Sequence, residues 1–324
     1  LFITGISQFS KVSIFSDLNN LRNITLAPQF GSITGITQQE LEQGFAPEIL
    51  ELKKEKPDIL AQIKQWYNGY TWNMKDWVYN PFSVLNFMAN TVFEEYWFET
   101  GTPDFLFRIL KNHSIYDVES FRLSRLSLST FNPENPNIGS LLFQTGYVTI
   151  KDITAEDQLY TLGFPNREVK ASLLDGLLSI YRGKENKDNL AIIVDLKASI
   201  KNGDVDGIIR YLYAMISDIA YDYWRPDTES IFTIITSIIF KKVGMDVATE
   251  VHSAKGRCDI LVKTPRYIYV LALKLDGSAA AALDQIKQMG YLAPFAQDPR
   301  KKLAVGISFS SEKRAVAEYE VEQL

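Results

Sequence analysis

The sequence has little of what several classes of protein require. It contains one cysteine, Cys258, which excludes an internal disulfide framework and a zinc ribbon and favours a reducing, cytoplasmic location. No apolar run reaches the eighteen or so residues of a membrane span, because the best candidate, 231–240, is short and contains polar side chains. Residues 1–5 lack an initiator methionine and the basic and apolar regions of a signal peptide. We therefore expect the chain to be a fragment that begins inside a domain.

The chain also lacks an excess of basic charge. It has 34 Lys or Arg against 39 Asp or Glu, and a formal net charge of −5, so nucleic acid would have to be bound by a local patch rather than by the whole surface. A hydrophobic fraction of 46% excludes a disordered or low-complexity chain. At 324 residues the chain exceeds what one core usually organises, so we expect two or three domains.

Several common catalytic motifs are missing as well. The sequence has no GxxxxGK[ST] phosphate loop, no GxGxxG dinucleotide loop and no GxSxG nucleophile elbow. His113 and His252 stand alone, without the HExxH spacing of a zinc site, so metal binding by either is not expected. Cys258 lies in an expected strand, where a buried structural thiol is the better interpretation than a nucleophile.

The pattern of expected elements divides the chain into three parts. Residues 1–125 are mostly helical, with a capping box at Thr37 and Glu40 and a helix from Asn80-Pro81 to about residue 90. In residues 126–204 we expect a helix at 141–146, paired strands at 147–150 and 158–161, a helix at 166–181 and a charged linker at 183–189. A short helix followed by a hairpin indicates a small winged-helix-like region.

Residues 205–324 show the clearest pattern. Expected helices cover 205–219, 228–243 and 278–289, and expected strands cover 246–251, 257–262, 267–275, 303–309 and 319–323. The order α-β-β-β-α-β predicts a compact α/β sandwich.

One group of polar residues in this last part indicates chemistry. Asp259 lies in an apolar strand, where a carboxylate is costly without a partner, and a hairpin places Lys274 near the same end of the sheet. Gln285 follows on a helix that would pack on these strands, and Glu229 begins the helix before the hairpin. A Mg²⁺-dependent phosphodiesterase needs this set: Asp259 and Glu229 to hold the metal, Lys274 to stabilise the phosphate and Gln285 to orient its neighbours. The structural alternative is an Asp259–Lys274 salt bridge, with Glu229 as a charge at a helix N-terminus.

Short motifs along the whole chain match those of one family. They are ITGISQFS (3–10), IFSDLNN (14–20), WYNGY (66–70), YNPFS (79–83), YWFETGTP (96–103), LFQTGY (142–147), LGFPN (162–166), GRCD (256–259), KLDGS (274–278) and QI (285–286) before GY (290–291). With these motifs the chain resembles bacterial proteins that join an AAA-ATPase-like module to a C-terminal PD-(D/E)XK nuclease-like domain. The resemblance implies the C-terminal, mostly helical part of the ATPase-like module in residues 1–125 and the nuclease-like domain in residues 205–324.

Two departures from the family pattern limit the activity that we expect. The Walker motifs would lie upstream of residue 1, so ATP belongs to the missing part and no ATPase activity is expected from this chain alone; Thr4 stands at a sensor-like position. The nuclease signature also requires an acidic residue two positions before Lys274, where this chain has Ala272. Because that substitution removes a Mg²⁺ ligand, we expect weak or no catalysis. Glu250 and Asp276 are acidic neighbours outside the expected place, and the sequence leaves open whether Ala272 is natural or engineered.

The charge of the last part bears on its partners. Residues 205–324 hold 15 Lys or Arg and 15 Asp or Glu, so DNA binding would rest on a local patch of Lys255, Arg257 and Lys274. The basic run 300–302 is better interpreted as a solvated turn before a strand, and the aromatic runs 66–70 and 96–98 as core packing. The sequence thus predicts a nucleic-acid-associated protein with a degenerate nuclease-like domain. The alternative is a non-catalytic DNA- or protein-binding regulatory module of an ATPase.

Overall fold

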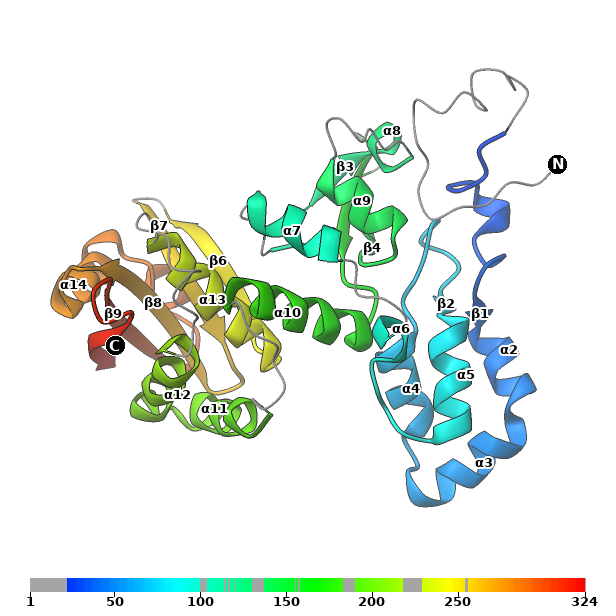
Figure 1. Cartoon of the computed structure of the whole chain (residues 1–324), viewed down its shortest axis with the longest axis horizontal. Helices are drawn as coiled ribbons and strands as arrows, with labels where there is room; N and C mark the ends of the chain where they lie inside the picture. The colour runs from blue at the N-terminus through cyan, green and yellow to red at the C-terminus, as the bar shows by residue number, and fades with distance from the viewer. Residues whose placement is uncertain are drawn as a thin grey trace. The chain divides into compact units, whose positions relative to one another are not determined.

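A computed structural model of the chain describes residues 22–99, 104–113, 115, 117–119, 121–129, 137–154, 156, 158–182, 190–217, 229–253 and 256–323. Within these ranges no helix combines the length and the apolar character that a membrane crossing requires. The chain forms two compact units, Leu1–Leu173 and Leu174–Leu324, and each is described by itself (Figure 1). The motifs at 3–10 and 14–20, Thr4, and the expected linker at 183–189 lie outside the described residues.

The first unit begins with a helical region. Its elements are η1 (Pro28–Phe30), β1 (Ile36–Thr37), α2 (Gln38–Gly44), α3 (Ala46–Glu55), α4 (Ile59–Tyr67), β2 (Val78–Tyr79), α5 (Pro81–Asn90), α6 (Tyr96–Glu99) and α7 (Asp104–Asn112). The predicted capping box is confirmed, because the Thr37 side chain accepts from the Glu40 amide and the Glu40 carboxylate accepts from the Thr37 amide. The predicted start of α5 is confirmed too: the Asn80 side chain accepts from the Phe82 amide, and Pro81 is the first helical residue.

Aromatic side chains form the core of this helical region. Tyr67 and Tyr96 are buried, and Phe93 stacks on Trp66 and on Phe87 at centroid distances of 5.5 and 4.5 Å. The prediction that the aromatic runs pack in the core is therefore confirmed for these residues.

The rest of the first unit contains a small antiparallel sheet of order β3-β5-β4. Its elements are β3 (Arg122–Ser124), α8 (Arg125–Leu128), α9 (Ile138–Gln144), β4 (Thr149–Thr154) and β5 (Leu159–Gly163), followed by α10 (Arg167–Arg182), which continues into the second unit. The predicted helix and hairpin are present with shifted bounds: α9 begins three residues earlier than expected, and the first strand of the hairpin lies at 149–154 instead of 147–150, with Ile153 opposite Tyr160. Every residue of α9 from Ile138 to Phe143 is buried.

The second unit is built on a five-stranded sheet of order β10-β9-β8-β7-β6. The strands are β6 (Asp246–Ser253), β7 (Gly256–Lys263), β8 (Tyr267–Leu275), β9 (Lys301–Ser310) and β10 (Ala315–Gln323), and only β8 and β9 run parallel. The predicted strands are confirmed, and β9 and β10 are longer than expected. The short helix η3 (Ala293–Phe295) precedes β9.

Helices cover both faces of this sheet (Figure 1). On one face α14 (Ala279–Met289) packs through Leu283 and Ile286 against Val270. On the other face α13 (Glu229–Lys242) packs through Phe232, whose ring stacks on Phe309 at 4.2 Å. The predicted α/β sandwich is thus the architecture of this unit.

One helix of the second unit was not predicted. Helix α11 (Leu190–Asn202) packs against α12 (Val205–Ser217), and the hydroxyl of Tyr269 donates to the Ile200 carbonyl at 2.5 Å. The apolar run 190–194 cannot be told from a buried strand by periodicity, so no helix is predicted there. The structure groups residues 190–202 with the second unit, whereas the division of the chain at 125 and 204 stays a prediction.

Candidate functional site

The candidate site lies where β7 and β8 separate. The two strands pair from Lys263 and Ile268 to Ile260 and Leu271; beyond that pair β7 continues beside β6, and β8 continues beside β9. Continuing the register places Asp259 opposite Ala272. Because side chains alternate between faces, both positions lie on the face covered by α14.

Asp259 is held at this separation by the main chain. Its carboxylate is half-buried, and Oδ2 accepts a hydrogen bond from the Leu273 amide at 2.7 Å. The carboxylate therefore accepts a hydrogen bond from a main-chain amide of β8 at the point where β7 and β8 stop pairing. This bond explains how an apolar strand tolerates a carboxylate.

Lys274 lies two residues after Ala272 on the same face of β8 and is half-buried. Within the part of the chain that the structure describes, Lys274 forms no ion pair, so the alternative of an Asp259–Lys274 salt bridge is wrong. The acidic neighbour Asp276 is engaged elsewhere: it accepts from the amide and hydroxyl of Ser311, and these bonds lower its pKa. Asp276 thereby fastens the end of β8 to the β9–β10 turn.

Gln285 lies on α14, over the same face as Asp259 and Lys274. Its Nε2 donates to the Tyr291 hydroxyl at 3.5 Å. Lys287, on one flank of α14, pairs with Glu322 of β10 at 2.5 Å. Gln285 is two residues away, about 200° around the helix, so it lies on the opposite flank, toward β7.

Ala272 lies directly beneath α14. It is 1% exposed, in a core with Ala282 and Ile286. Its neighbour in the register is Gly306, where an added Cβ would lie 2.3 Å from the Ala279 carbonyl oxygen and 2.7 Å from the Leu283 amide nitrogen. Such close contact between helix and sheet leaves room for small side chains only.

The remaining predicted residues are not brought to this face by the described structure. Glu229 is the first residue of α13, which covers the opposite face; its side chain, that of Arg257, and the whole of Lys255 lie outside the described part. Among the residues that are described, no group of three or more His, Cys, Asp or Glu is placed to hold a metal ion. Asp259 alone, with one oxygen bonded to an amide, does not fit a Mg²⁺ site, which needs several oxygen ligands.

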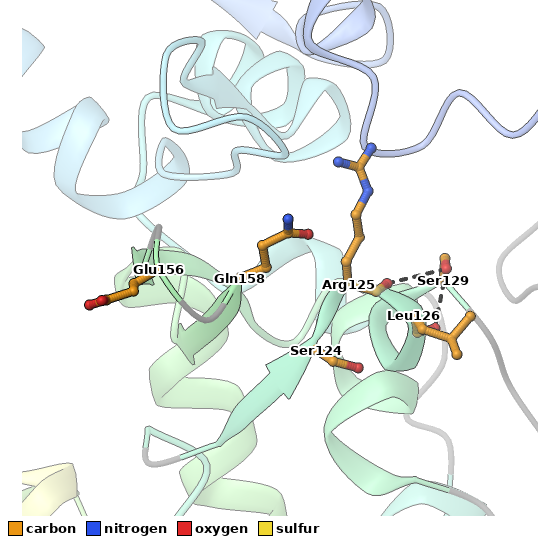
Figure 2. A pocket seen from close by; sticks show the side chains of 6 residues that line it. All are labelled: Ser124, Arg125, Leu126, Ser129, Glu156 and Gln158. Atoms are coloured by element: carbon orange, nitrogen blue, oxygen red, sulfur yellow. Dashed lines mark hydrogen bonds between the residues drawn. The ribbon is translucent and has the colours of Figure 1, made fainter.

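The first unit offers a hollow of about 630 Å³ but no comparable set of groups. It is lined by Ser124, Arg125, Leu126, Ser129, Glu156 and Gln158. Figure 2 shows the Arg125 and Glu156 side chains pointing in different directions. The Ser129 hydroxyl donates to the main-chain carbonyls of Arg125 and Leu126. The described groups that line this hollow therefore do not converge on one point.

Comparison with known proteins adds a family to this geometry. Residues 227–319 match the model of the PD-(D/E)XK nuclease superfamily. This part of the chain is a PD-(D/E)XK nuclease superfamily domain. The matched residues include β7 and β8, and with them Asp259, Ala272 and Lys274.

The whole chain also has a relative. It is 32% identical, over 332 residues, to an uncharacterized protein in the vnfD 5′ region of Azotobacter chroococcum mcd 1. The alignment spans 99% of this chain and 63% of that protein, so the chain covers less than two thirds of its relative. No solved structure matches the chain.

Two features around the nuclease superfamily domain's site were not predicted. One is the Leu273 amide, which no side-chain pattern can reveal. The other is the close approach of α14 to Gly306. The sequence contains a signal for it, because a glycine inside an apolar strand such as 303–309 often marks a close approach of another backbone.

Proposed function

We propose that residues 205–324 bind nucleic acid as a degenerate nuclease-like domain that cleaves phosphodiesters weakly or not at all. The observation that carries this proposal is the buried Ala272 at the register position opposite Asp259. A carboxylate is absent there, and Asp259 already accepts a main-chain hydrogen bond. A hard divalent cation needs several oxygen ligands, and among the described residues no group of three or more His, Cys, Asp or Glu is placed to hold one, so we expect poor Mg²⁺ binding.

The binding role rests on cations near the site. Lys274 stands on the same face as Asp259, and Lys255 and Arg257 precede Asp259 along the chain. Lys and Arg contacts to phosphate supply affinity without reading sequence. We propose that this local patch contacts the backbone of DNA and that Gln285, bonded to Tyr291, keeps the flank of α14 in place beside it.

For the rest of the chain we propose the C-terminal, mostly helical part of an AAA-ATPase-like module in residues 1–125 and a winged-helix-like region in residues 126–204. The order α7, β3, α8, α9, β4, β5 and the sheet order β3-β5-β4 support the second assignment. Nucleotide hydrolysis would belong to a longer protein. A regulatory role is the second candidate, and the burial of α9 favours it, because a buried helix cannot enter a DNA groove.

A cleavage assay with a restored carboxylate tests the proposal. Supercoiled plasmid and single-stranded DNA are incubated with Mg²⁺ or Mn²⁺ and with the chain, Ala272→Glu, or Ala272→Glu combined with Asp259→Asn. We expect trace cleavage at most by the chain, a gain in Ala272→Glu and loss of that gain in the double variant. Rapid cleavage by the chain itself, abolished by Lys274→Met, would contradict degeneracy. No cleavage by any variant, with DNA binding intact, favours the regulatory role. Failure to bind DNA at low salt contradicts DNA binding both by a degenerate nuclease-like domain and by a regulatory module.

A further inference from the structure

Six cations gather at the end of the second sheet where β8 and β9 begin. They are Lys201, Lys263, Arg266, Arg300, Lys301 and Lys302, named here the basic end. Tyr267 and Lys301 are register partners, and the Lys301 amide donates to the Arg266 carbonyl at 3.0 Å. The Tyr267 hydroxyl donates to the Asn202 carbonyl at 3.1 Å, which brings Lys201 of α11 to the same place.

The basic end is separate from the nuclease-like site. Ala272, opposite Asp259, lies five residues along β8 from Tyr267. At about 3.3 Å per residue in a strand, the two places are about 16 Å apart. A ligand at one need not contact the other.

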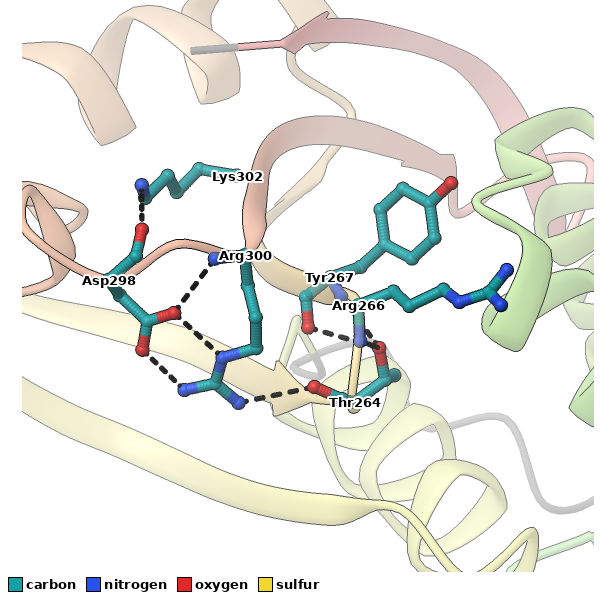
Figure 3. A network of polar contacts seen from close by, with 6 residues as sticks. All are labelled: Thr264, Arg266, Tyr267, Asp298, Arg300 and Lys302. Atoms are coloured by element: carbon teal, nitrogen blue, oxygen red, sulfur yellow. Dashed lines mark hydrogen bonds and ion pairs between the residues drawn. The ribbon is translucent and has the colours of Figure 1, made fainter.

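One acidic residue fixes the frame of the basic end. Asp298 accepts from Nε and Nη2 of Arg300 at 2.9 and 2.6 Å, and Nη1 of Arg300 donates to the Thr264 carbonyl at 3.1 Å (Figure 3). Lys302 donates to the main-chain carbonyl of Asp298. These bonds fasten the loop before β9 to the β7–β8 turn, so the neighbouring cations stand on a fixed backbone, which lowers the entropy cost of binding. Lys301 and Lys302 are the first residues of β9, and the expected solvated turn at 300–302 is wrong.

Three other cations of the basic end are exposed to solvent. Lys201, Arg266 and Lys301 are exposed, and within the described ranges none of the three is ion-paired. In Figure 3 the Arg266 side chain extends away from the Asp298–Arg300 pair.

Cations outnumber acidic residues at the basic end. Three acidic residues accompany the six cations: Asp298, Asp204 beside α11, and Asp246, the register partner of Lys263. Residues 205–324 sum to zero, while Glu318, Glu320 and Glu322 lie together on β10. The basic end therefore has a local excess of positive charge, with six cations against three carboxylates.

We propose that the basic end binds the phosphate backbone of double-stranded DNA, as a contact surface that works without the nuclease-like site. Duplex DNA presents about one negative charge per 1.7 Å of its axis, which suits several exposed cations on a fixed frame. Contacts of this kind carry no sequence information, so binding is expected to be independent of sequence. The inference shares the class of ligand with the proposed function and depends on different residues.

The test measures duplex affinity of the full chain against salt. Fluorescence anisotropy with a 30-base-pair duplex compares the chain with Arg266→Glu/Lys301→Glu and with a matched control, Lys53→Glu/Lys56→Glu, exposed in the first unit. We expect the basic-end variant to bind at least about tenfold more weakly near physiological salt and its salt slope to fall by about two, because two phosphate contacts are lost. The control should match the chain. The milder Arg266→Ala/Lys301→Ala should show a smaller loss in the same direction if charge reversal disturbs folding.

The same assay with Lys274→Glu, a change beside Asp259, separates this inference from the proposed function. If only Lys274→Glu weakens duplex binding, the basic end is not a DNA surface and the inference is overturned, while the proposed function stands. If only the basic-end variant does, the inference stands and the patch at the nuclease-like site is wrong. Binding of phosphatidylserine vesicles that Arg266→Glu/Lys301→Glu abolishes, with duplex affinity unchanged, would overturn the inference in favour of an anionic membrane surface.

Discussion

Ser83 and Glu168, 85 positions apart in the sequence, are joined in the first unit by a hydrogen bond of 2.9 Å from the serine hydroxyl to Oε1 of the glutamate. The Trp97 amide donates to the same oxygen at 2.8 Å. Glu168 is fully buried, and its burial raises its pKa to about 7. Its Oε2 is buried and has no hydrogen-bond partner among the described residues. Burial and the nearby charge of Glu168 raise the pKa of the Tyr70 hydroxyl. One carboxyl group with a raised pKa thus lies near a residue from each of three motifs: Tyr70, Ser83 and Trp97.

This carboxyl predicts a pH-dependent stability. The folded pKa of Glu168 lies above its ordinary value of 4.5, so the folded state holds the proton more tightly than the unfolded state. The free energy of unfolding should therefore fall as pH rises from about 5 to about 8, by on the order of 3 kcal/mol at most. Glu168→Gln keeps an acceptor oxygen and cannot ionise, so its stability should lack this component. Urea unfolding at pH 5.5, 7 and 8.5, followed by tryptophan fluorescence, measures the difference; four of the five tryptophans lie in the first unit. A difference between the two proteins that does not change with pH would contradict the prediction.

Ala272→Glu should be less stable than the chain in metal-free buffer. A glutamate at this buried position meets α14 and loses hydration, at a cost of about 2–4 kcal/mol. Mg²⁺ should recover part of this loss in thermal melts, because a ligand that binds only the folded state stabilises it. Ala281→Glu, on the exposed side of the same helix, is the matched control and should melt near the temperature of the chain with or without Mg²⁺. Equal stability of Ala272→Glu and the chain without metal would show that position 272 is less tightly packed than this structure has it.

Asp259→Ala should weaken the end of β8 in the absence of any metal. It leaves the Leu273 amide without the acceptor that now lies 2.7 Å away, a loss of about 1–3 kcal/mol. Asp259→Asn retains an acceptor oxygen and should lose less. Hydrogen–deuterium exchange at the Leu273 amide should accelerate clearly in the alanine variant and only slightly in the asparagine variant. Unchanged exchange in both would mean that the carboxylate has no structural role.

The features that the sequence predicted are those set by neighbouring residues. The caps at Thr37 and Asn80 depend on side chains within three positions, and β8 was found in full because nine consecutive residues share one apolar pattern. The hairpin spacing was enough to bring Asp259 and Lys274 to one face. The sequence does not show on which face of the sheet Glu229 lies, because that depends on the packing of α13 against the face opposite α14. The separation of β7 from β8 likewise depends on pairing with β6 and β9, which the sequence does not encode locally.

Gly306→Ala should disturb the packing of α14 above the nuclease-like site. The added Cβ would lie 2.3 and 2.7 Å from backbone atoms of Ala279 and Leu283, and backbone cannot turn away as a flexible side chain can, so the helix must shift. We expect a loss of about 2 kcal/mol or more, since overpacking of a well-packed core typically costs about 1–3 kcal/mol. Gly44→Ala is the control: it ends α2, an added Cβ there meets nothing within 4 Å, and the change should be neutral or stabilising by up to about 1 kcal/mol. Thermal and urea melts of the two variants check this. If Gly306→Ala is as stable as Gly44→Ala, α14 is not held against the sheet at Ala272, and the small residue there needs a different explanation.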